Sequence, residues 1–167
     1  MKNLFKASIL LILTLFISCS DNTEEIENTN FIKMNVNGEE LTFNSLVIDS
    51  FIDSGKGEEV IEITATIKNR TDRILTISIF KDALGANSLS DFAYFTNEGG
   101  YFTGSLVVSS NDQLCDGSPL GTNRFNFVTS TNNNETLSGN FSGELFSCED
   151  NKPLNIIITN GSFNYNF

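Results

Sequence analysis

Short segments of alternating apolar and polar residues, separated by turn signals, constrain the fold of this chain more than any other feature. Residues 61–67 and 75–79 each place their apolar side chains on one face and polar side chains on the other. A period of two is the pattern of a β-strand, and the β-branched residues in these segments favour a strand over a helix. Asn37-Gly38 lies between two such segments, and this dipeptide is a strong signal for a tight β-hairpin.

The same pattern continues to the end of the chain and predicts roughly nine or ten short strands. The last part divides into strands at 136–148, 154–160 and 162–167, with Gly161 between the last two. We therefore expect a single all-β domain over residues 31–167, built as an antiparallel β-sandwich or a flattened β-barrel. The choice between them depends on the shear between strands, which the sequence does not show.

Glycine alternates with larger apolar residues inside the segment at 136–148. The residues that share this face are Leu137, Gly139, Phe141, Gly143 and Leu145. Glycines in the interior of a strand predict a bend or a place where another strand approaches closely.

The first 18 residues have the composition of an export signal. Lys2 and Lys6 form a basic head, and the 14 residues from Ala7 to Ser20 carry no charge. As a helix this stretch would reach about 21 Å, short of the hydrocarbon core of about 30 Å. We therefore expect residues 1–18 to be a cleaved signal peptide rather than a membrane span.

The residues around Cys19 indicate a lipid anchor. Phe16-Ile17-Ser18-Cys19 resembles the bacterial lipobox, and the resemblance implies a multiply acylated Cys19 that becomes the new N-terminus. An ordinary secretory peptide, with Cys19 incidental, is the alternative. Residues 20–30 carry four acids and no base, which predicts a disordered tether between lipid and domain. We expect an outer-membrane protein held through the lipid on Cys19; the acidic spacer resembles a surface-export signal.

Composition argues against several classes of function. Removal of Lys2 and Lys6 leaves 8 basic residues against 21 acidic ones, a net charge of −13, which disfavours nucleic acid as a partner. The chain has no histidine, so Ser-His and Cys-His catalytic arrangements are excluded. G-x-S-x-G and phosphate-binding loop motifs are also missing, and we expect no enzymatic activity. A hydrolase that uses two carboxylates remains an alternative.

The cysteines and the acidic loops offer the remaining candidate sites. Cys115 and Cys148 form an even pair in an oxidising compartment, where a disulfide would close a loop of 34 residues; two separate thiols are the alternative. We expect no cofactor and no bound metal, although two oxygen-rich turns have residues that bind calcium elsewhere. These residues are Asp49, Asp53 and Glu58 in the first turn, and Asn111, Asp112 and Asp116 in the second.

Aromatic residues cluster in the middle of the chain. They are Phe92, Tyr94, Phe95, Tyr101 and Phe102. Because strand residues alternate between faces, about half of these rings must face the core. Exposed members of the cluster are the place to look for a bound glycan or lipid.

Three segments resemble a group of small Bacteroidota lipoproteins that carry a domain of unknown function. Residues 31–38 resemble the opening strand and Asn-Gly turn of that group, 137–141 its "SGxF" strand, and 158–163 its terminal "TNGxF" strand. The resemblance implies a single extracytoplasmic β domain and assigns no catalytic residue.

These observations together predict a lipid-anchored, non-catalytic β domain at the outer membrane, with a binding or surface-structural role. A glycan, a small apolar ligand and a protein are the candidate partners besides the membrane. A lipocalin-like carrier with an apolar cavity inside a barrel is the alternative function.

Overall fold

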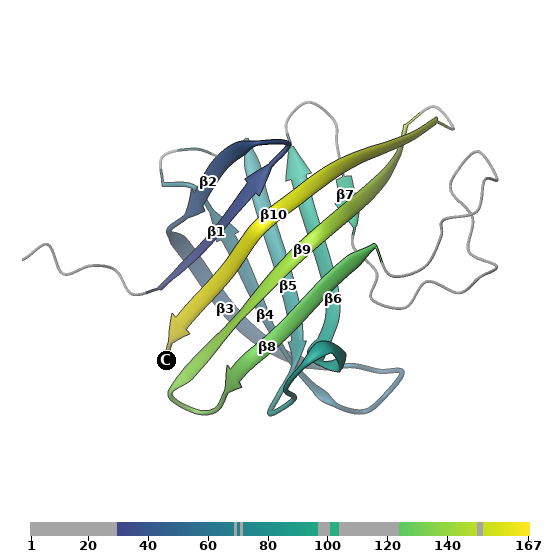
Figure 1. The fold of residues 1–167 in the computed structure, drawn as a ribbon. Helices are drawn as coiled ribbons and strands as arrows, with labels where there is room; N and C mark the ends of the chain where they lie inside the picture. The colour runs from purple at the N-terminus through teal and green to yellow at the C-terminus, as the bar shows by residue number, and fades with distance from the viewer. Residues whose placement is uncertain (1–29, 69, 71, 97–100, 104–123, 150–151) are drawn as a thin grey trace, which may run out of the picture.

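The computed structural model describes residues 30–68, 70, 72–96, 101–103, 124–149 and 152–167 (Figure 1). Ten strands make up 75% of this part of the chain, and one turn of 3₁₀ helix, η2 (Ala86–Ser88), precedes β6. The strands are β1 (Phe31–Val36), β2 (Glu39–Phe43), β3 (Ser45–Ile52), β4 (Glu59–Thr66), β5 (Arg73–Phe80), β6 (Leu89–Thr96), β7 (Tyr101–Thr103), β8 (Phe125–Asn132), β9 (Thr136–Glu149) and β10 (Lys152–Asn166). The predicted all-β class is confirmed.

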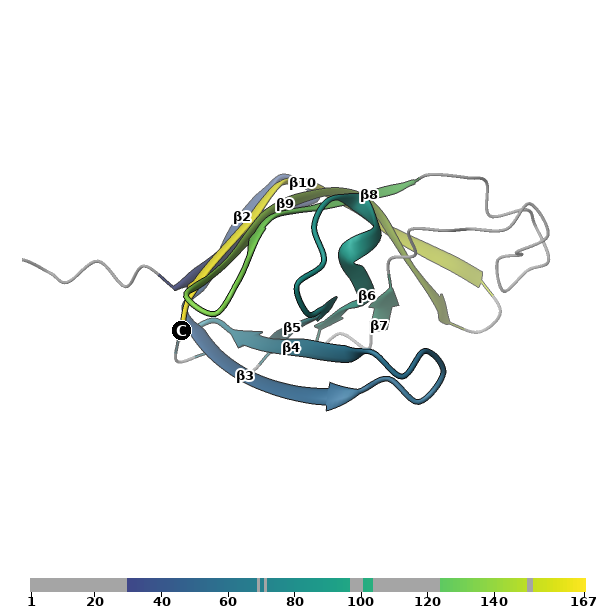
Figure 2. The same cartoon turned by 90° about the horizontal axis from the view of Figure 1, so that it is seen from below.

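The strands pair antiparallel in the order β2-β1-β10-β9-β7-β6-β5-β4-β3, and β8 pairs with β9 outside this path. The path folds over at β7, so that β8, β9, β10, β1 and β2 face β3 to β6 across the core. Figure 2 shows these two layers from the side. The path ends at β2 and β3, which are joined through Asn44 without closing a barrel. Of the two architectures expected, the sandwich is the one observed.

The β1–β2 hairpin forms at the predicted dipeptide. Asn37 and Gly38 both have positive φ, 50° and 90°, as a type I′ turn requires. The turn leaves Val36 opposite Glu39, and the apolar side chains of both strands then point into the core. The prediction made from Asn37-Gly38 is therefore confirmed.

The start of β1 is fastened to the end of β10. The Asn30 side chain accepts a hydrogen bond from the Asn166 backbone nitrogen at 2.8 Å and donates one to its carbonyl oxygen at 3.2 Å. The two ends of the described domain therefore lie side by side (Figure 1).

Five phenylalanine rings from both layers fill one part of the interior. They are Phe92, Phe125, Phe127, Phe141 and Phe163, and each is no more than 3% exposed. The Phe92 ring centroid lies 4.7 Å from that of Phe125 and 5.1 Å from that of Phe141, while Phe127 stacks on Phe163 at 5.3 Å. Contacts at these distances between faces and edges are favourable, and they join β6 of one layer to β8, β9 and β10 of the other.

Close strand approach explains the glycines of β9 and β10. A Cβ at Gly139 would lie 2.3 Å from the Val128 carbonyl oxygen and 2.6 Å from the Phe163 ring. A Cβ at Gly161 would lie 2.4 Å from the ring of Phe141. The close approach predicted for the glycines of this segment is confirmed at Gly139.

The end of the chain differs from the prediction. Residues 154–160 and 162–167 were expected to be two strands separated at Gly161, but one strand of 15 residues, β10, runs through Gly161 from Lys152 to Asn166. The register shifts between Ile158 and Gly161, which is a bulge, and Asn160 has a positive φ of 54°. Gly161 thus permits a bulge beneath an aromatic ring rather than a chain reversal.

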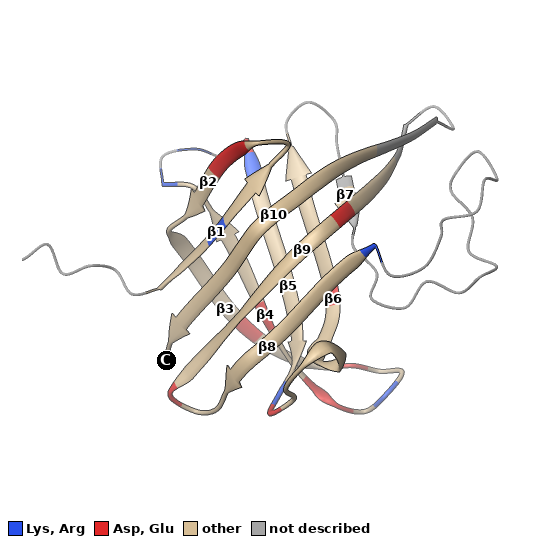
Figure 3. Ribbon diagram, in the orientation of Figure 1, with Lys and Arg blue, Asp and Glu red and all other residues tan. Residues whose placement is uncertain are grey.

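Charged residues lie at both ends of the sandwich: on β2 and near the start of β5 at one end, and on turns at the other end, where the C-terminus lies (Figure 3). Among the described residues, no helix has the length and apolar character needed to cross a membrane.

Candidate functional site

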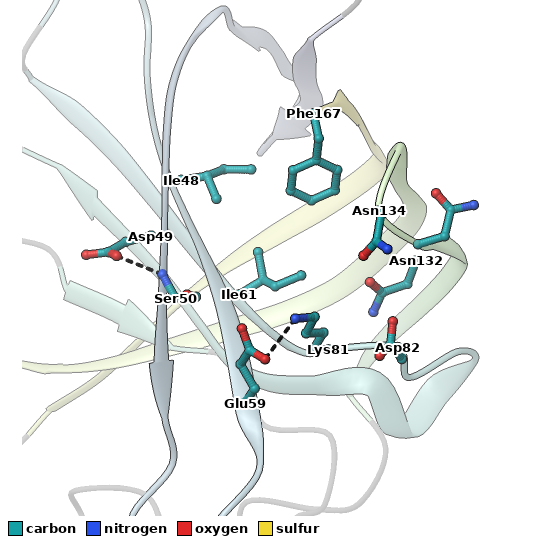
Figure 4. A pocket seen from close by; sticks show the side chains of 11 residues that line it. Ile48, Asp49, Ser50, Glu59, Ile61, Lys81, Asp82, Asn132, Asn134 and Phe167 are labelled. Atoms are coloured by element: carbon teal, nitrogen blue, oxygen red, sulfur yellow. Dashed lines mark hydrogen bonds and ion pairs between the residues drawn. The ribbon is translucent and has the colours of Figure 1, made fainter.

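A cleft of about 360 Å³ opens at this end of the sandwich, between the edge of the β3–β4 layer and the turn that follows β8 (Figure 4). Its size is near the lower end of the range for small-molecule sites. Eleven residues line it: Ile48, Asp49, Ser50, Glu59, Ile61, Lys81, Asp82, Asn132, Asn133, Asn134 and Phe167.

The β3–β4 hairpin supplies one wall. In its register, Ser50 pairs with Ile61 and Ile52 with Glu59. Ile61 is buried, and Ile48 is partly buried beside it, so both carry apolar surface to the cleft. The Asp49 carboxylate accepts a hydrogen bond from the backbone nitrogen of Ser50 at 2.8 Å and is directed away from the cleft in Figure 4.

An ion pair forms the floor. The Lys81 ammonium lies 2.8 Å from a Glu59 carboxylate oxygen, and the Lys81 backbone nitrogen donates to the Glu59 carbonyl at 2.9 Å. The hydrogen bond and the charge of Glu59 raise the pKa of Lys81 above its usual value, so the ammonium stays protonated. Asp82 follows with a positive φ of 60°, which turns the chain beneath the cleft.

Asn132 is the most unusual residue of the lining. It is only 8% exposed, and its Nδ2 atom donates to the carbonyl oxygens of Phe80 at 2.9 Å and Ala83 at 3.1 Å. Two carbonyl acceptors fix the orientation of the amide, because only its nitrogen can donate to them. The Oδ1 atom is then left buried without a hydrogen-bond partner in the described structure, and the amide projects into the cleft (Figure 4).

The turn after Asn132 and the end of β10 complete the rim. The Asn133 side-chain oxygen accepts hydrogen bonds from the backbone nitrogens of Glu135 at 2.9 Å and Thr136 at 2.8 Å, which fixes the turn. The Phe167 backbone nitrogen donates to the Glu135 carbonyl oxygen at 3.0 Å. The Phe167 ring, 56% exposed, packs edge-on against Tyr165 with centroids 5.3 Å apart. This places an aromatic surface at the entrance to the cleft.

The first acidic turn is structured by its own hydrogen bonds. Asp53 accepts from the backbone nitrogens of Gly55 and Lys56, both at 2.8 Å, in the manner of an Asx-turn. Asp49 lies on β3, and no group of three or more acidic or cysteine side chains that could hold a metal ion occurs among the described residues. Asn111, Asp112 and Asp116 of the second turn lie outside those residues.

Three residues of the lining carry carboxylates, and a two-carboxylate hydrolase would need two of these groups to face each other across the cleft. Such an enzyme uses one carboxyl group as the acid and another as nucleophile or base on the same bond. Glu59 is bound to Lys81, and Asp49 is bound to the backbone beside it. Glu59 is therefore engaged in an ion pair and Asp49 is directed away from the cleft, so that only Asp82 of the three remains for such a role.

The aromatic cluster divides as strand alternation predicts. Phe92, Tyr94 and Phe102 are buried, whereas Phe95 is 37% exposed on the outer face of β6. The Tyr101 side chain is not among those described. These rings belong mainly to the core, and none of them lines the cleft.

The predicted lipidation and disulfide sites remain predictions. Cys19, the signal peptide and residues 20–29 of the tether lie outside the described residues, and so does Cys115. Cys148 belongs to β9, but its side chain is not described.

Sequence reasoning did not single out Asn132, Lys81 or Phe167 as site residues. Asn132 is the last residue of β8, and Asn133 and Asn134 belong to the turn that follows it. The alternation of Phe125, Phe127 and Thr129 would make Thr131 the next core residue, but a register shift after Thr129 brings Asn132 into the interior instead. No pattern in the sequence could therefore have identified Asn132.

Comparisons with protein-family models, with curated proteins and with solved structures found no match for this chain.

Proposed function

We propose that this protein is a lipid-anchored, non-catalytic binding domain of the outer membrane, and that it takes up its ligand in the cleft at the end of the sandwich. The observation that carries the binding role is the Asn132 Oδ1 atom, a buried acceptor directed into the cleft without a partner. Leaving such an atom unsatisfied costs about 1–3 kcal/mol, and a ligand that donates to it recovers part of that cost.

The anchor in this proposal rests on the sequence. The basic head, the short apolar stretch and Cys19 support export and acylation, and the acidic residues after Cys19 support display at the cell surface. The resemblance to Bacteroidota lipoproteins points the same way. More than one acyl chain is needed for stable anchoring, as a lipoprotein modification supplies.

A lipocalin-like carrier is the alternative, and the interior argues against it. A carrier of that type holds its cargo inside a closed barrel, between the sheets. In this structure the sheet does not close, and the ring cluster around Phe92 and Phe127 occupies the space between the layers. An apolar cargo would have to displace these rings.

Cell fractionation tests the anchor. Cys19→Ala should move the protein from the membrane fraction to the soluble fraction and should abolish labelling by radioactive palmitate. Continued palmitate labelling of the Cys19→Ala variant would refute acylation at this residue.

Capture of partners from solubilised cell-envelope material tests the binding role. The chain over residues 19–167 is immobilised, and the bound material is compared with that held by Phe167→Ala. Phe51→Ala serves as the matched control, because Phe51 is 45% exposed on β3 but does not line the cleft. We expect Phe167→Ala to lose bound material that Phe51→Ala retains. Identical capture by all three proteins would contradict a binding role for the cleft.

A further inference from the structure

We propose that the ligand of the cleft is a neutral saccharide, bound as one or two sugar rings. The inference rests on the proposed binding role and names the chemical class of ligand for the same site. It follows from the hydrogen-bonding character of the lining, from its charges and from its apolar wall.

The hydrogen-bonding character requires a donor. Asn132 presents an oxygen that can only accept, and the two carbonyl oxygens of Phe80 and Ala83 prevent its amide from flipping. A ligand that offers only acceptors, such as an ionised carboxylate, cannot satisfy this atom. A hydroxyl group can donate to Asn132 and accept from another group at the same time.

The charges of the lining favour a neutral ligand. Glu59 and Asp82 outnumber the single cation of the lining, Lys81, so an anion would be repelled. A cation would gain little binding energy from Glu59, because that carboxylate is already paired with Lys81 at 2.8 Å. Hydroxyl groups suit this lining, since carboxylates, asparagine amides and Ser50 can exchange hydrogen bonds with them without a change in charge.

The apolar wall of the cleft offers a surface on which the C–H face of a sugar ring can pack. A sugar ring has a face of C–H groups and a rim of hydroxyls, so a matching site needs an apolar surface beside polar groups. Ile48, Ile61 and the Phe167 ring provide that surface, and Asn132, Asn134 and Asp82 lie across the cleft from Ile48 and Ile61 (Figure 4). The Phe167 ring is 56% exposed and is held in place by Tyr165 and by its backbone bond to Glu135.

NMR titration of the ¹⁵N-labelled chain over residues 19–167, carrying Cys19→Ala, tests the ligand class. Neutral mono- and disaccharides form one set of probes, and putrescine and inorganic phosphate are the cationic and anionic probes. We expect at least one saccharide to shift the Asn132 side-chain amide and the Phe167 backbone signals in a saturable way, with little effect of salt. Phe167→Ala should weaken this binding about tenfold or more, whereas Phe51→Ala should leave it unchanged.

Three results would overturn the proposal. One is a cleft that responds to putrescine or phosphate and to no saccharide, which would replace the ligand class and leave the binding role intact. A second is saccharide binding that Phe167→Ala does not weaken, which would place the sugar elsewhere. The third is the absence of any response to all of the probes, which would refute the saccharide as ligand. If capture from envelope material still depended on Phe167, the proposed binding role of the cleft would stand without it.

Discussion

Replacement of Gly139 by alanine should destabilise the domain strongly, although it adds a single methyl group. That methyl group would lie 2.3 Å from the Val128 carbonyl oxygen and 2.6 and 2.7 Å from two carbons of the Phe163 ring. Favourable carbon–carbon contacts lie at about 3.5–4.0 Å, so the ring would have to move by about 1 Å.

The surroundings of Gly139 leave little room for that movement. Phe163 is 3% exposed and stacks on Phe127 at 5.3 Å, so the two rings must shift together. Val128 belongs to β8, which is paired with β9, and its carbonyl can retreat only if the strands separate. Overpacking typically costs about 1–3 kcal/mol, and contact with both a backbone atom and a packed ring places this site at the upper end, about 3 kcal/mol. For a domain of this size we expect the melting temperature to fall by about 10 °C.

Equilibrium unfolding in urea, followed by circular dichroism, measures this change. Gly55→Ala is the control, because its added Cβ meets only the side-chain oxygen of Asp53, at 3.3 Å, and its φ is not positive. We expect the control to stay within about 0.5 kcal/mol of the unsubstituted protein. Equal stability of Gly139→Ala and Gly55→Ala would refute the close approach of β8 to β9 and the packing of Phe163 over Gly139.

Two further predictions concern the core and the cysteines. Burial raises the pKa of Tyr94 above 10.0, and the neighbouring Arg73 only partly opposes this. A pKa that is raised in the folded state stabilises the fold at pH values below the unfolded-state pKa, and this stabilisation is lost as the pH rises through the folded-state pKa. The urea midpoint should therefore fall less steeply above pH 10 in Tyr94→Phe than in the unsubstituted protein. Parallel curves of midpoint against pH would contradict this. For Cys115 and Cys148, we expect alkylation to increase the intact mass at these two residues only after the protein has been reduced. Alkylation of both thiols without reduction would exclude the disulfide.

Much of the strand pattern could be predicted because burial in a sandwich repeats with the period of the strand. In β4, Ile61, Ile63 and Ala65 are buried and the residues between them are partly exposed, as the alternation indicates. The hairpin at Asn37-Gly38 was also predictable, because the turn type depends on those two residues alone.

Gly161 shows where local reasoning fails. A glycine between two apolar segments fits a chain reversal as well as it fits a bulge inside a continuous strand. The choice was decided by the Phe141 ring, which lies 20 residues earlier in the chain and occupies the space where a side chain would be. No pattern within the segment carries that information.

The cleft was still harder to predict, because it is made by residues that meet only after folding. Asn132 donates to Phe80 across 52 residues of sequence, and Lys81 joins Glu59 across 22. Each of these residues occurs next to a turn, where polar residues are common and give no indication of function. The burial of Asn132 and the pairing of Lys81 with Glu59 depend on how the strands pair and how the two layers of the sandwich pack on each other.

Under the lipid anchor proposed at Cys19, the pairing of Asn30 with Asn166 would set which end of the domain faces the membrane. Asn166 precedes Phe167 at the rim of the cleft, so a chain held through its N-terminal side is held beside the cleft. The tether predicted from the sequence, residues 20–30, would have a typical reach of about 18 Å as a random coil. The distance between the cleft and the membrane would then limit the size of the ligands that can reach the cleft. The ends and short branches of a saccharide could enter between the domain and the membrane surface. A bulky polymer could bind only if the domain first tilted away from that surface.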